Sequence, residues 1–411
     1  MSRKSILILS VTVFVIAFNI QACKFSNKDK GDDSRLGNAT KHVRQKSTFR
    51  PEPVNISEVY PGIIKLNDIQ KKSTNPDLFM SKDGDIYVTW IEISKGERRL
   101  SIIKKNTGSE KWETFDSSIK FNGDLKGHSV AVDREGILHL AFLGEQTELY
   151  NIFYAMRDDY GWTLPENLSD SMDYDYPPHM AIGPGGSVHI VWSEYFGKFS
   201  GVYYRGKAEG KWSPLEDYQV KKSDDDWLPS LAVDAGGKIH LAFHHIENKK
   251  GVSYRTIAGD GTASAPETVF EGDIPAGHAK ISLDEGGNPH LFFLMDDGDG
   301  NDIFYSRKEN GKWQKAVNLS NTKNISLGHE VVKDVTGEFH LFWSETIIGG
   351  KQTVIMHIHG KDGKWSTPEK LVETGNYMFN ISASLKNDGN IGIVWEDRKG
   401  PASDVLFKWM N

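Results

Sequence analysis

The fold follows from Val132-Asp133-Arg134-Glu135-Gly136-Ile137-Leu138-His139-Leu140-Ala141-Phe142, a stretch that recurs along this chain. It returns as Val233-Asp234-Ala235-Gly236-Gly237-Lys238-Ile239-His240-Leu241-Ala242-Phe243. The glycine of its turn recurs at spacings of 52, 50, 51, 50, 50 and 52 residues, at Gly84, Gly136, Gly186, Gly237, Gly287, Gly337 and Gly389. A repeat of about 40–50 residues that holds several short strands is typical of propeller blades. The sequence therefore predicts an all-β fold, a seven-bladed β-propeller with four-stranded antiparallel blades.

The two ends of the repeat region predict how the ring closes. The last repeat stops after a third strand at 404–409, and residues 62–66 read as an outer strand without a blade of its own. An N-terminal strand that completes the last blade would remove two exposed sheet edges. We therefore expect one propeller domain over 56–411.

Composition narrows the classes of partner. The 411 residues carry a net charge of −7, and 38% of them are hydrophobic, which is ordinary for a globular protein. Because no block of Lys and Arg resembles a nucleic-acid footprint, we expect no nucleic-acid partner. We expect a monomer whose partner is a glycan or polysaccharide.

The first 22 residues predict export. A basic start, Arg3-Lys4, precedes an apolar run over 5–18 that has the length of a signal-peptide core. Cys23, the single cysteine, ends a segment that resembles a bacterial lipobox, so we expect it to be lipidated. The alternative is a plain secretory signal with an incidental cysteine. Residues 23–55 are polar and read as a flexible tether, which would hold the domain at a bacterial envelope, most simply at the outer membrane.

Residues that recur in most repeats are expected to belong to the framework. Histidine opens the second strand of five repeats, tyrosine recurs on the third strand, and tryptophan recurs at the turn that follows. We interpret these side chains as packing between blades rather than as catalysts. They are His139, His189, His240, His290 and His340; Tyr154, Tyr204, Tyr254 and Tyr305; and Trp112, Trp162, Trp212, Trp313 and Trp365.

Candidate functional residues crowd the axis or break the repeat. Four innermost strands begin with a histidine: His128, His179, His278 and His329. Histidine suits general acid–base catalysis near neutral pH. The alternative is that these side chains cap turns or pack the neck of the channel. Several second strands end with a side chain suited to acid–base chemistry or anion binding: Glu194, Glu345, His244, His245 and Arg398. The alternative is that the carboxylates only accept hydrogen bonds from loop amides. Loop aromatics suited to stacking on sugar rings are Tyr174, Tyr176, Tyr195, Trp227 and Tyr377.

One segment has oxygen ligands at alternate positions, as a calcium loop does: Asp297, Asp299 and Asn301. It lacks the later glutamate of such loops, and a tight hairpin explains it better. We therefore expect no cofactor and no metal in the reaction.

The repeated stretch over 132–142 and 233–243 resembles the sialidase-like, BNR-type propeller superfamily, and the resemblance covers residues 60–411. The Asp boxes and the Arg-Ile-Pro motif of sialidases are absent, so sialidase activity is not expected. Related seven-bladed folds include polysaccharide lyases, rhamnosidase-type enzymes and lectins. The resemblance thus implies an exported protein that processes carbohydrate as a lyase or glycosidase, or a non-catalytic propeller that binds glycan or protein at the cell surface.

Overall fold

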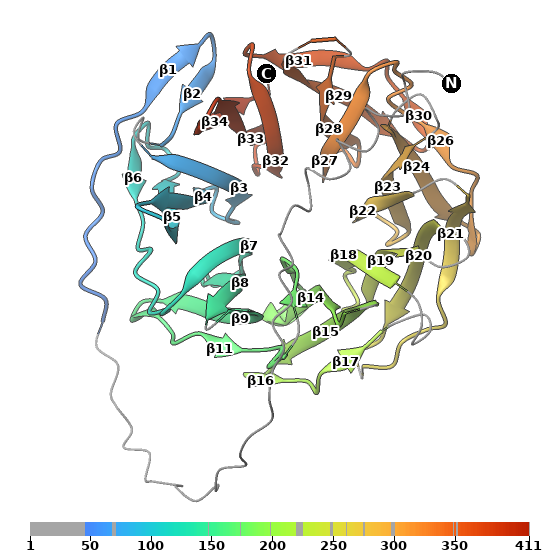
Figure 1. Cartoon of the computed structure of the whole chain (residues 1–411), viewed down its shortest axis with the longest axis horizontal. Coiled ribbons are helices and arrows are strands. Elements are labelled where there is room, and N and C mark those ends of the chain that lie inside the picture. Colours follow the sequence, from blue (N-terminus) through green and yellow to red (C-terminus); the bar gives the residue numbers. More distant parts are fainter. Residues whose placement is uncertain are drawn as a thin grey trace, which may run out of the picture. The chain divides into compact units, whose positions relative to one another are not determined.

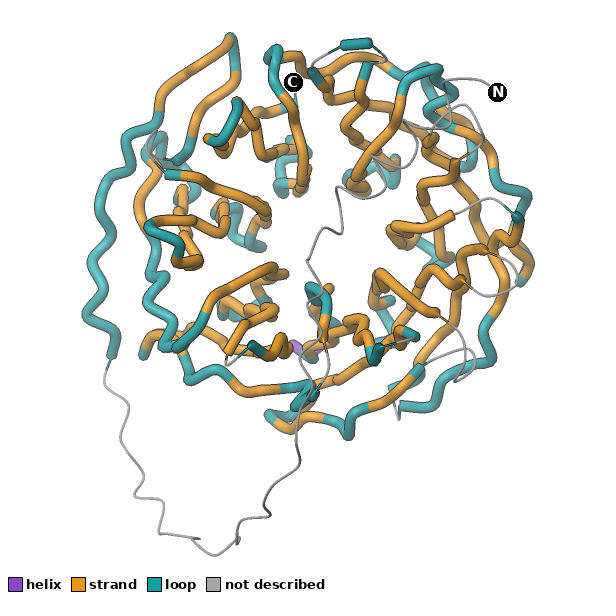
Figure 2. The backbone as a smooth tube through the Cα atoms, viewed as in Figure 1, coloured by secondary structure: helices purple, strands orange, loops and turns teal. Residues whose placement is uncertain are grey.

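Antiparallel strands account for nearly all the regular structure of this protein. A computed structural model describes residues 46–67, 71–146, 148–172, 174–197, 199–218, 225–246, 250–259, 261–273, 276–296, 301–347, 349–350 and 352–410. Figure 1 and Figure 2 show the strands set in sheets around a common axis. Within these residues the one helical segment is the 3-10 turn η3 (Pro184–Gly186). The all-β prediction is confirmed.

The first sheets follow one another along the chain. The first has the order β3-β4-β5-β6, with bounds β3 (Lys72–Met80), β4 (Ile86–Ser94), β5 (Glu97–Lys105) and β6 (Trp112–Thr114). Two meanders share the second sheet, because β12 pairs parallel to β9 and antiparallel to β14. Its strands are β7 (Asp124–Val132), β8 (Leu138–Gln146), β9 (Leu149–Asp158), β10 (Gly161–Trp162), β11 (Glu166–Asn167), β12 (Tyr174–Asp175), β13 (His179–Ile182), β14 (Val188–Tyr195), β15 (Ser200–Ala208), β16 (Lys211–Trp212) and β17 (Glu216–Asp217).

Three further sheets repeat the same meander. The first of them holds β18 (Asp225–Val233), β19 (Ile239–Ile246), β20 (Lys250–Ile257) and β21 (Glu267–Gly272). The next holds β22 (Ala276–Leu283), β23 (Pro289–Asp296), β24 (Asn301–Glu309), β25 (Lys312–Trp313) and β26 (Val317–Asn318). The third holds β27 (Ile325–Lys333), β28 (Phe339–Thr346), β29 (Thr353–Lys361), β30 (Lys364–Trp365) and β31 (Glu369–Glu373).

The last sheet joins both ends of the repeat region. Its order is β1-β2-β34-β33-β32, with bounds β1 (Ser57–Tyr60), β2 (Ile63–Lys65), β34 (Ala402–Trp409), β33 (Ile391–Lys399) and β32 (Tyr377–Leu385). Ile63 pairs with Lys408, and the Leu66 amide donates to the Val405 carbonyl at 2.9 Å. The N-terminal strand expected at 62–66 therefore completes the last sheet, as predicted.

The N-terminal segment already contacts the sheets before residue 56, the position at which the sequence predicts the start of the domain. Residues of the predicted tether already bond to the sheets, since the Thr114 amide donates to the Glu52 carbonyl at 2.7 Å. Phe49 also contacts Phe115, with ring centroids 6.4 Å apart. The signal segment, Cys23 and the tether up to residue 45 lie outside the described residues. Among the residues described, we find no helix both long and apolar enough to cross a bilayer.

Hydrophobic cores lie between consecutive sheets. One cluster packs Val191 and Tyr204 of the second sheet against Leu231 and Leu241 of the third. Another packs the first sheet against the last one, through Leu66, Leu78, Val88, Val394 and Phe407. Each innermost strand also contacts the next one around the axis, and β32 contacts β3.

Turn glycines and strand histidines build the repeat as expected. Gly136 has φ of +80°, and its amide donates to the Asp133 carbonyl at 3.2 Å, a conformation that strongly favours glycine. His139 bonds through Nε2 to Asp133 at 3.1 Å and through Nδ1 to the Tyr154 hydroxyl at 2.7 Å. Trp212 of the next meander packs edge-on against Tyr154, with centroids 4.9 Å apart. The predicted framework role of these residues is confirmed.

Candidate functional site

The two ends of the sheets differ, and we name them for what they carry. At the turn end lie the glycine turns between first and second strands. At the other end, six innermost strands shift register just after they begin, so we call it the bulge end. Every candidate catalytic or substrate-binding side chain from the sequence lies near the axis or toward the bulge end.

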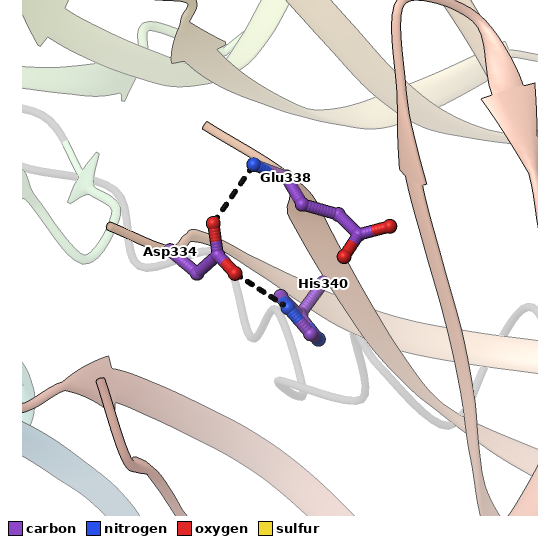
Figure 3. A group of neighbouring side chains, drawn as sticks. All are labelled: Asp334, Glu338 and His340. Atoms are coloured by element: carbon purple, nitrogen blue, oxygen red, sulfur yellow. Dashed lines mark hydrogen bonds and ion pairs between the residues drawn. The ribbon is translucent and has the colours of Figure 1, made fainter. Parts of the chain in front are cut away.

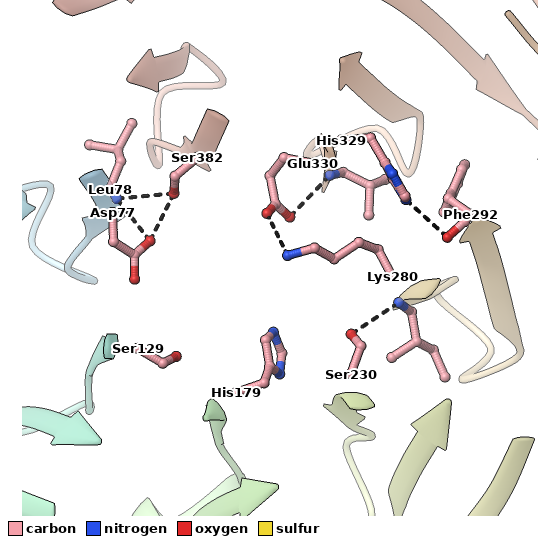
Figure 4. Close-up of polar contacts among 12 residues, drawn as sticks. Asp77, Leu78, Ser129, His179, Ser230, Lys280, Phe292, His329, Glu330 and Ser382 are labelled. Atoms are coloured by element: carbon pink, nitrogen blue, oxygen red, sulfur yellow. Dashed lines mark hydrogen bonds and ion pairs between the residues drawn. The ribbon is translucent and has the colours of Figure 1, made fainter. Parts of the chain in front are cut away.

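One residue from each innermost strand lies at the axis, at the position seven residues before the turn glycine: Asp77, Ser129, His179, Ser230, Lys280, Glu330 and Ser382. Figure 4 shows their side chains gathered there. Most accept a backbone N–H from the next strand around the axis, at 3.0–3.3 Å: Asp77 from Val130, Ser129 from Met180, His179 from Leu231, Ser230 from Ile281, and Ser382 from Leu78. This ring of bonds ties neighbouring sheets together, so the axis position is chiefly structural.

Lys280 departs from that pattern because an ammonium cannot accept a hydrogen bond. Its Nζ instead donates to Glu330 at 2.9 Å (Figure 4). Burial opposes the charge on Lys280, but the neighbouring Glu330 outweighs burial and raises the pKa of the amine. The axis therefore holds a fixed ion pair rather than a free cation.

The four rim histidines do not form one set. His128 bonds through Nε2 to the Thr89 hydroxyl at 2.8 Å, and His329 through Nε2 to the Phe292 carbonyl at 3.0 Å. Burial lowers the pKa of His128 to about 4 and those of His179 and His329 to about 3, so these imidazoles are neutral at pH 7. His278 is exposed on β22, in the left-handed conformation with φ of +52°.

The carboxylates at the ends of second strands mostly hold their own loops. Glu345 accepts the Asn324 amide at 2.7 Å and the Thr322 hydroxyl at 3.2 Å. Asp397 accepts the Asn376 amide at 2.6 Å in the same way. Glu194 accepts the Ser171 hydroxyl. These acids lie on different sheets, and each is bound to its own loop. This agrees with the alternative stated for them above, in which the carboxylates hold their loops.

Aromatic side chains from β14, β18 and the segment that follows β12 come together at the bulge end. Tyr176 lies edge-on to Trp227 with ring centroids 4.9 Å apart, and Tyr195 lies 6.2 Å from the same indole. Tyr174 is 54% exposed and contacts Tyr150 at 5.5 Å. The structure thus gathers three of the five predicted sugar-stacking residues, Tyr176, Tyr195 and Trp227, into one aromatic group, and Tyr174 pairs with Tyr195 at its edge.

His244 lies directly beside this aromatic group. It is opposite Trp227 in the β18–β19 register, and its ring contacts Gly277 so closely that a Cβ there would lie 3.2 Å away. His244 Nδ1 and Trp227 Nε1 are buried atoms without a hydrogen-bond partner among the described residues. Burial lowers the pKa of His244 to about 3, with His278 and His245 adding to the effect. His245 faces Ser253, whose hydroxyl lies 3.0 Å from its Nδ1.

Arg398 belongs to a second group at the bulge end, over β32, β33 and β3. Its Nη2 and Nε donate to the buried Glu396 at 2.6 and 3.1 Å, while 39% of the side chain stays exposed. The guanidinium lies 5.1 Å from the centre of the Phe379 ring, which stacks on Tyr377. Glu396 also accepts from Thr74 at 2.8 Å. This arrangement fixes one face of Arg398 and leaves the other for an anion.

Sequence reasoning missed part of this support. Asn75 and Asn380, both with positive φ, bond to one another at 2.9 Å, and Asn380 also donates to Glu396. Asn at the same bulge position of two repeats is the signal that could have found them. Asp175 was missed because nothing in the sequence shows that its carboxyl group is buried opposite Glu194. The calcium candidates Asp297 and Asp299 lie outside the described residues; Asn301 begins β24.

Comparisons with known proteins rest on structure alone. No protein-family model and no curated protein matches the sequence significantly. Among solved structures, an ulvan lyase from a new polysaccharide lyase family matches with a TM-score of 0.60 at 12% identity, over 82% of this chain and 93% of its own. The chain has a β-propeller fold.

Two further structures agree with that assignment. The ulvan lyase bound to -[GlcA(1-4)Rha3S]- gives a TM-score of 0.58 at 13% identity, over the same shares of the two chains. A protein of unknown function from Dyadobacter fermentans gives a TM-score of 0.52 at 11% identity, over 85% of this chain and 99% of its own. The propeller fold expected from the sequence is thereby confirmed, and such low identities extend the likeness no further.

Proposed function

We propose that this protein processes an acidic polysaccharide at the bulge end of the propeller. The observation that carries the proposal is the gathering of Tyr176, Tyr195 and Trp227 beside the exposed Tyr174, which no repeat of the framework requires. Aromatic faces stack on sugar rings, and Tyr176, Tyr195 and Trp227 are each partly exposed. The half-exposed Arg398 supplies a cation for a carboxylate or sulfate.

Elimination suits this end of the molecule better than hydrolysis. A glycosidase needs two carboxyl groups that flank one bond, whereas Glu345 and Asp397 are each bound to their own loops. A lyase needs a cation at the uronate carboxylate, a base for the adjacent proton, and an acid for the leaving oxygen. Arg398 is proposed as the cation, and Tyr377, which pairs with Arg398 in the β32–β33 register and is 41% exposed, as the base.

A product assay distinguishes the reaction classes. The full chain would be incubated with a panel of uronate polysaccharides, and the products followed by ultraviolet absorbance and by reducing ends. Unsaturated uronate ends would support elimination, and new reducing ends without unsaturation would indicate a glycosidase. The variant Arg398→Ala is expected to lose turnover, whereas Arg134→Ala, an exposed arginine at the turn end, is the matched control.

A non-catalytic glycan-binding propeller is the second candidate. The observation that favours it is the state of His128, His179 and His329, which are neutral and bonded to the framework. Saturable binding of an oligosaccharide with no product from any substrate in the panel would support this function over the first.

The finer features of the chain are proposals as well. We propose seven blades, supported by the contacts that link the innermost strands in one circuit from β3 to β32. We also propose a lipid on Cys23 and placement at the outer membrane of a bacterium, supported by the sequence of the first 23 residues. Incorporation of labelled palmitate by the wild type, and its loss in Cys23→Ser, tests the anchor.

A further inference from the structure

A cluster at the turn end of the sheet β27–β31 lies outside the proposed polysaccharide site. Asp334, Glu338 and His340 each place one ligand atom within 4.8 Å of the others (Figure 3). The Asp334 and His340 side chains are 16% and 14% exposed, and that of Glu338 is 31% exposed. Solvent can therefore reach the three side chains, although each is mostly buried.

The same turn in other sheets shows what the framework alone requires. His240 receives the Tyr254 hydroxyl on Nδ1 at 2.7 Å, and its Nε2 faces Asp234 at 3.5 Å. Because a carboxylate only accepts, the ring proton sits on Nε2 and points at the aspartate, and Nδ1 accepts from the tyrosine hydroxyl. Each imidazole nitrogen then faces a group of matching polarity, and no further cation is needed.

In the sheet β27–β31 a histidine replaces that tyrosine and reverses the chain of donors. His357 Nδ1 lies 3.1 Å from Glu369, and its Nε2 lies 3.1 Å from His340 Nδ1. Because a carboxylate only accepts, the His357 proton sits on Nδ1, and His340 must donate from Nδ1 to His357 Nε2. His340 Nε2 is left with a lone pair, which faces the Asp334 carboxylate at 3.6 Å.

The Asp334 carboxylate and the His340 lone pair therefore face each other with no donor between them, and Glu338, which accepts from His359, brings a second carboxylate to them. Asp334 Oδ1 is already satisfied by the amides of Thr336 and Glu338, at 2.8 Å each, which leaves Oδ2 for the cluster. Asn288 holds the place of Glu338 in the preceding sheet, and among the seven turns only the first, with Asp85, also has a carboxylate there. The arrangement repels itself unless a cation lies at its centre.

We propose that Asp334, Glu338 and His340 form a binding site for a divalent transition-metal ion such as Zn²⁺. One imidazole nitrogen and two carboxylate oxygens are a ligand set that Zn²⁺ accepts, with water in the fourth position. Ligand atoms around tetrahedral zinc lie about 3.3 Å apart, so the cluster would contract by about an ångström. His357 would act as a positioning residue, because it holds the tautomer and orientation of His340.

The surrounding charges are compatible with a dication. His359 Nδ1 lies 2.7 Å from Glu338 Oε1, so it orients that carboxylate and can turn to become a further ligand. Lys361 donates to the Thr336 carbonyl on the outer side of the turn. The two carboxylates of the site balance the charge of one divalent ion. The bound ion would fasten the β27–β28 turn, at the end of the sheets opposite to Arg398.

Calorimetric titration of the full chain with Zn²⁺ tests the proposal. We expect one ion per chain and a rise in Tm of about 4 °C at a hundredfold excess over Kd. Glu338→Gln should lose this binding. His357→Tyr should lose it too, although His357 is not a ligand, because a tyrosine restores the donor pattern of the other sheets. His290→Gln, which disrupts the same framework pair in the preceding sheet, should bind Zn²⁺ as the wild type does.

Three results would overturn the proposal. The first is a wild type that binds no Zn²⁺ at a tenfold molar excess. The second is binding that survives Glu338→Gln, which would place the ion elsewhere. The third is an imidazole NMR spectrum in which His340 is protonated on both nitrogens at neutral pH, because the cation would then be a proton. Circular dichroism of each variant shows that it is folded.

Discussion

Asp175→Asn should stabilise the protein at alkaline pH, because Asp175 is a carboxyl group buried opposite another one. Its side chain is 4% exposed and lies across from Glu194 in the β12–β14 pairing. Burial raises the pKa of Asp175 from 3.8 to about 8, and the negative charge of Glu194 adds to the effect. In the unfolded chain the same group ionises near its ordinary pKa.

The sign follows from proton binding. Between pH 3.8 and about 8 the folded state holds one proton more than the unfolded state, so stability falls as pH rises through this window. A shift of about four units at about 1.4 kcal/mol each puts the loss at about 5 kcal/mol in order of magnitude. Asparagine cannot ionise, and therefore the variant escapes this loss.

Guanidinium unfolding at about pH 4 and about pH 9 measures the effect. We expect similar unfolding free energies for Asp175→Asn and the wild type at the acidic pH, and a variant several kcal/mol more stable at the alkaline pH. Asp273→Asn, at an exposed site, is the control and should follow the wild type. A stability difference that does not change with pH would refute the reasoning, because it would mean that Asp175 titrates normally.

Three further substitutions test the site and the ring. Trp227→Ala should weaken oligosaccharide binding about tenfold by isothermal titration, while Tyr160→Ala, an exposed tyrosine away from the aromatic group, should leave Kd unchanged. Leu66→Ala should lower the unfolding free energy by about 2–4 kcal/mol in urea, since Leu66 is buried between the first and last sheets; no change would contradict that packing. Tyr254→Phe should cost about 1–2 kcal/mol by the same method, because His240 Nδ1 loses its donor; a neutral result would argue against the framework role.

The fold was predictable because its signals are local and repeated. A turn that requires positive φ selects glycine, as at Gly136, and alternation marks each strand. The framework role of His139 was equally visible, since a histidine recurs at the same place in five repeats. The closing strand at 62–66 could be inferred because a ring leaves no free edge.

The site was only partly predictable, since a repeated sequence pattern does not show how buried a carboxyl group is or which nitrogen of a histidine carries the proton. Trp227 and Arg398 stood out because they break the pattern, and the structure places each within a polar or aromatic group. Asp175 looks like an ordinary loop acid until its burial is known. His357 fills a tyrosine position, and only the contact with Glu369 shows that it changes the neighbouring imidazole.

Turnover of a uronate polysaccharide is the most direct test of the central claim that the bulge end processes acidic polysaccharide. The full chain would be compared with the double variant Trp227→Ala/Arg398→Ala and with the control Tyr160→Ala/Arg134→Ala, each verified as folded. The account predicts that the wild type and the control release unsaturated uronate ends at similar rates, and that the double variant releases few or none. A double variant as fast as the wild type, or a wild type that cleaves no member of the panel, would contradict it.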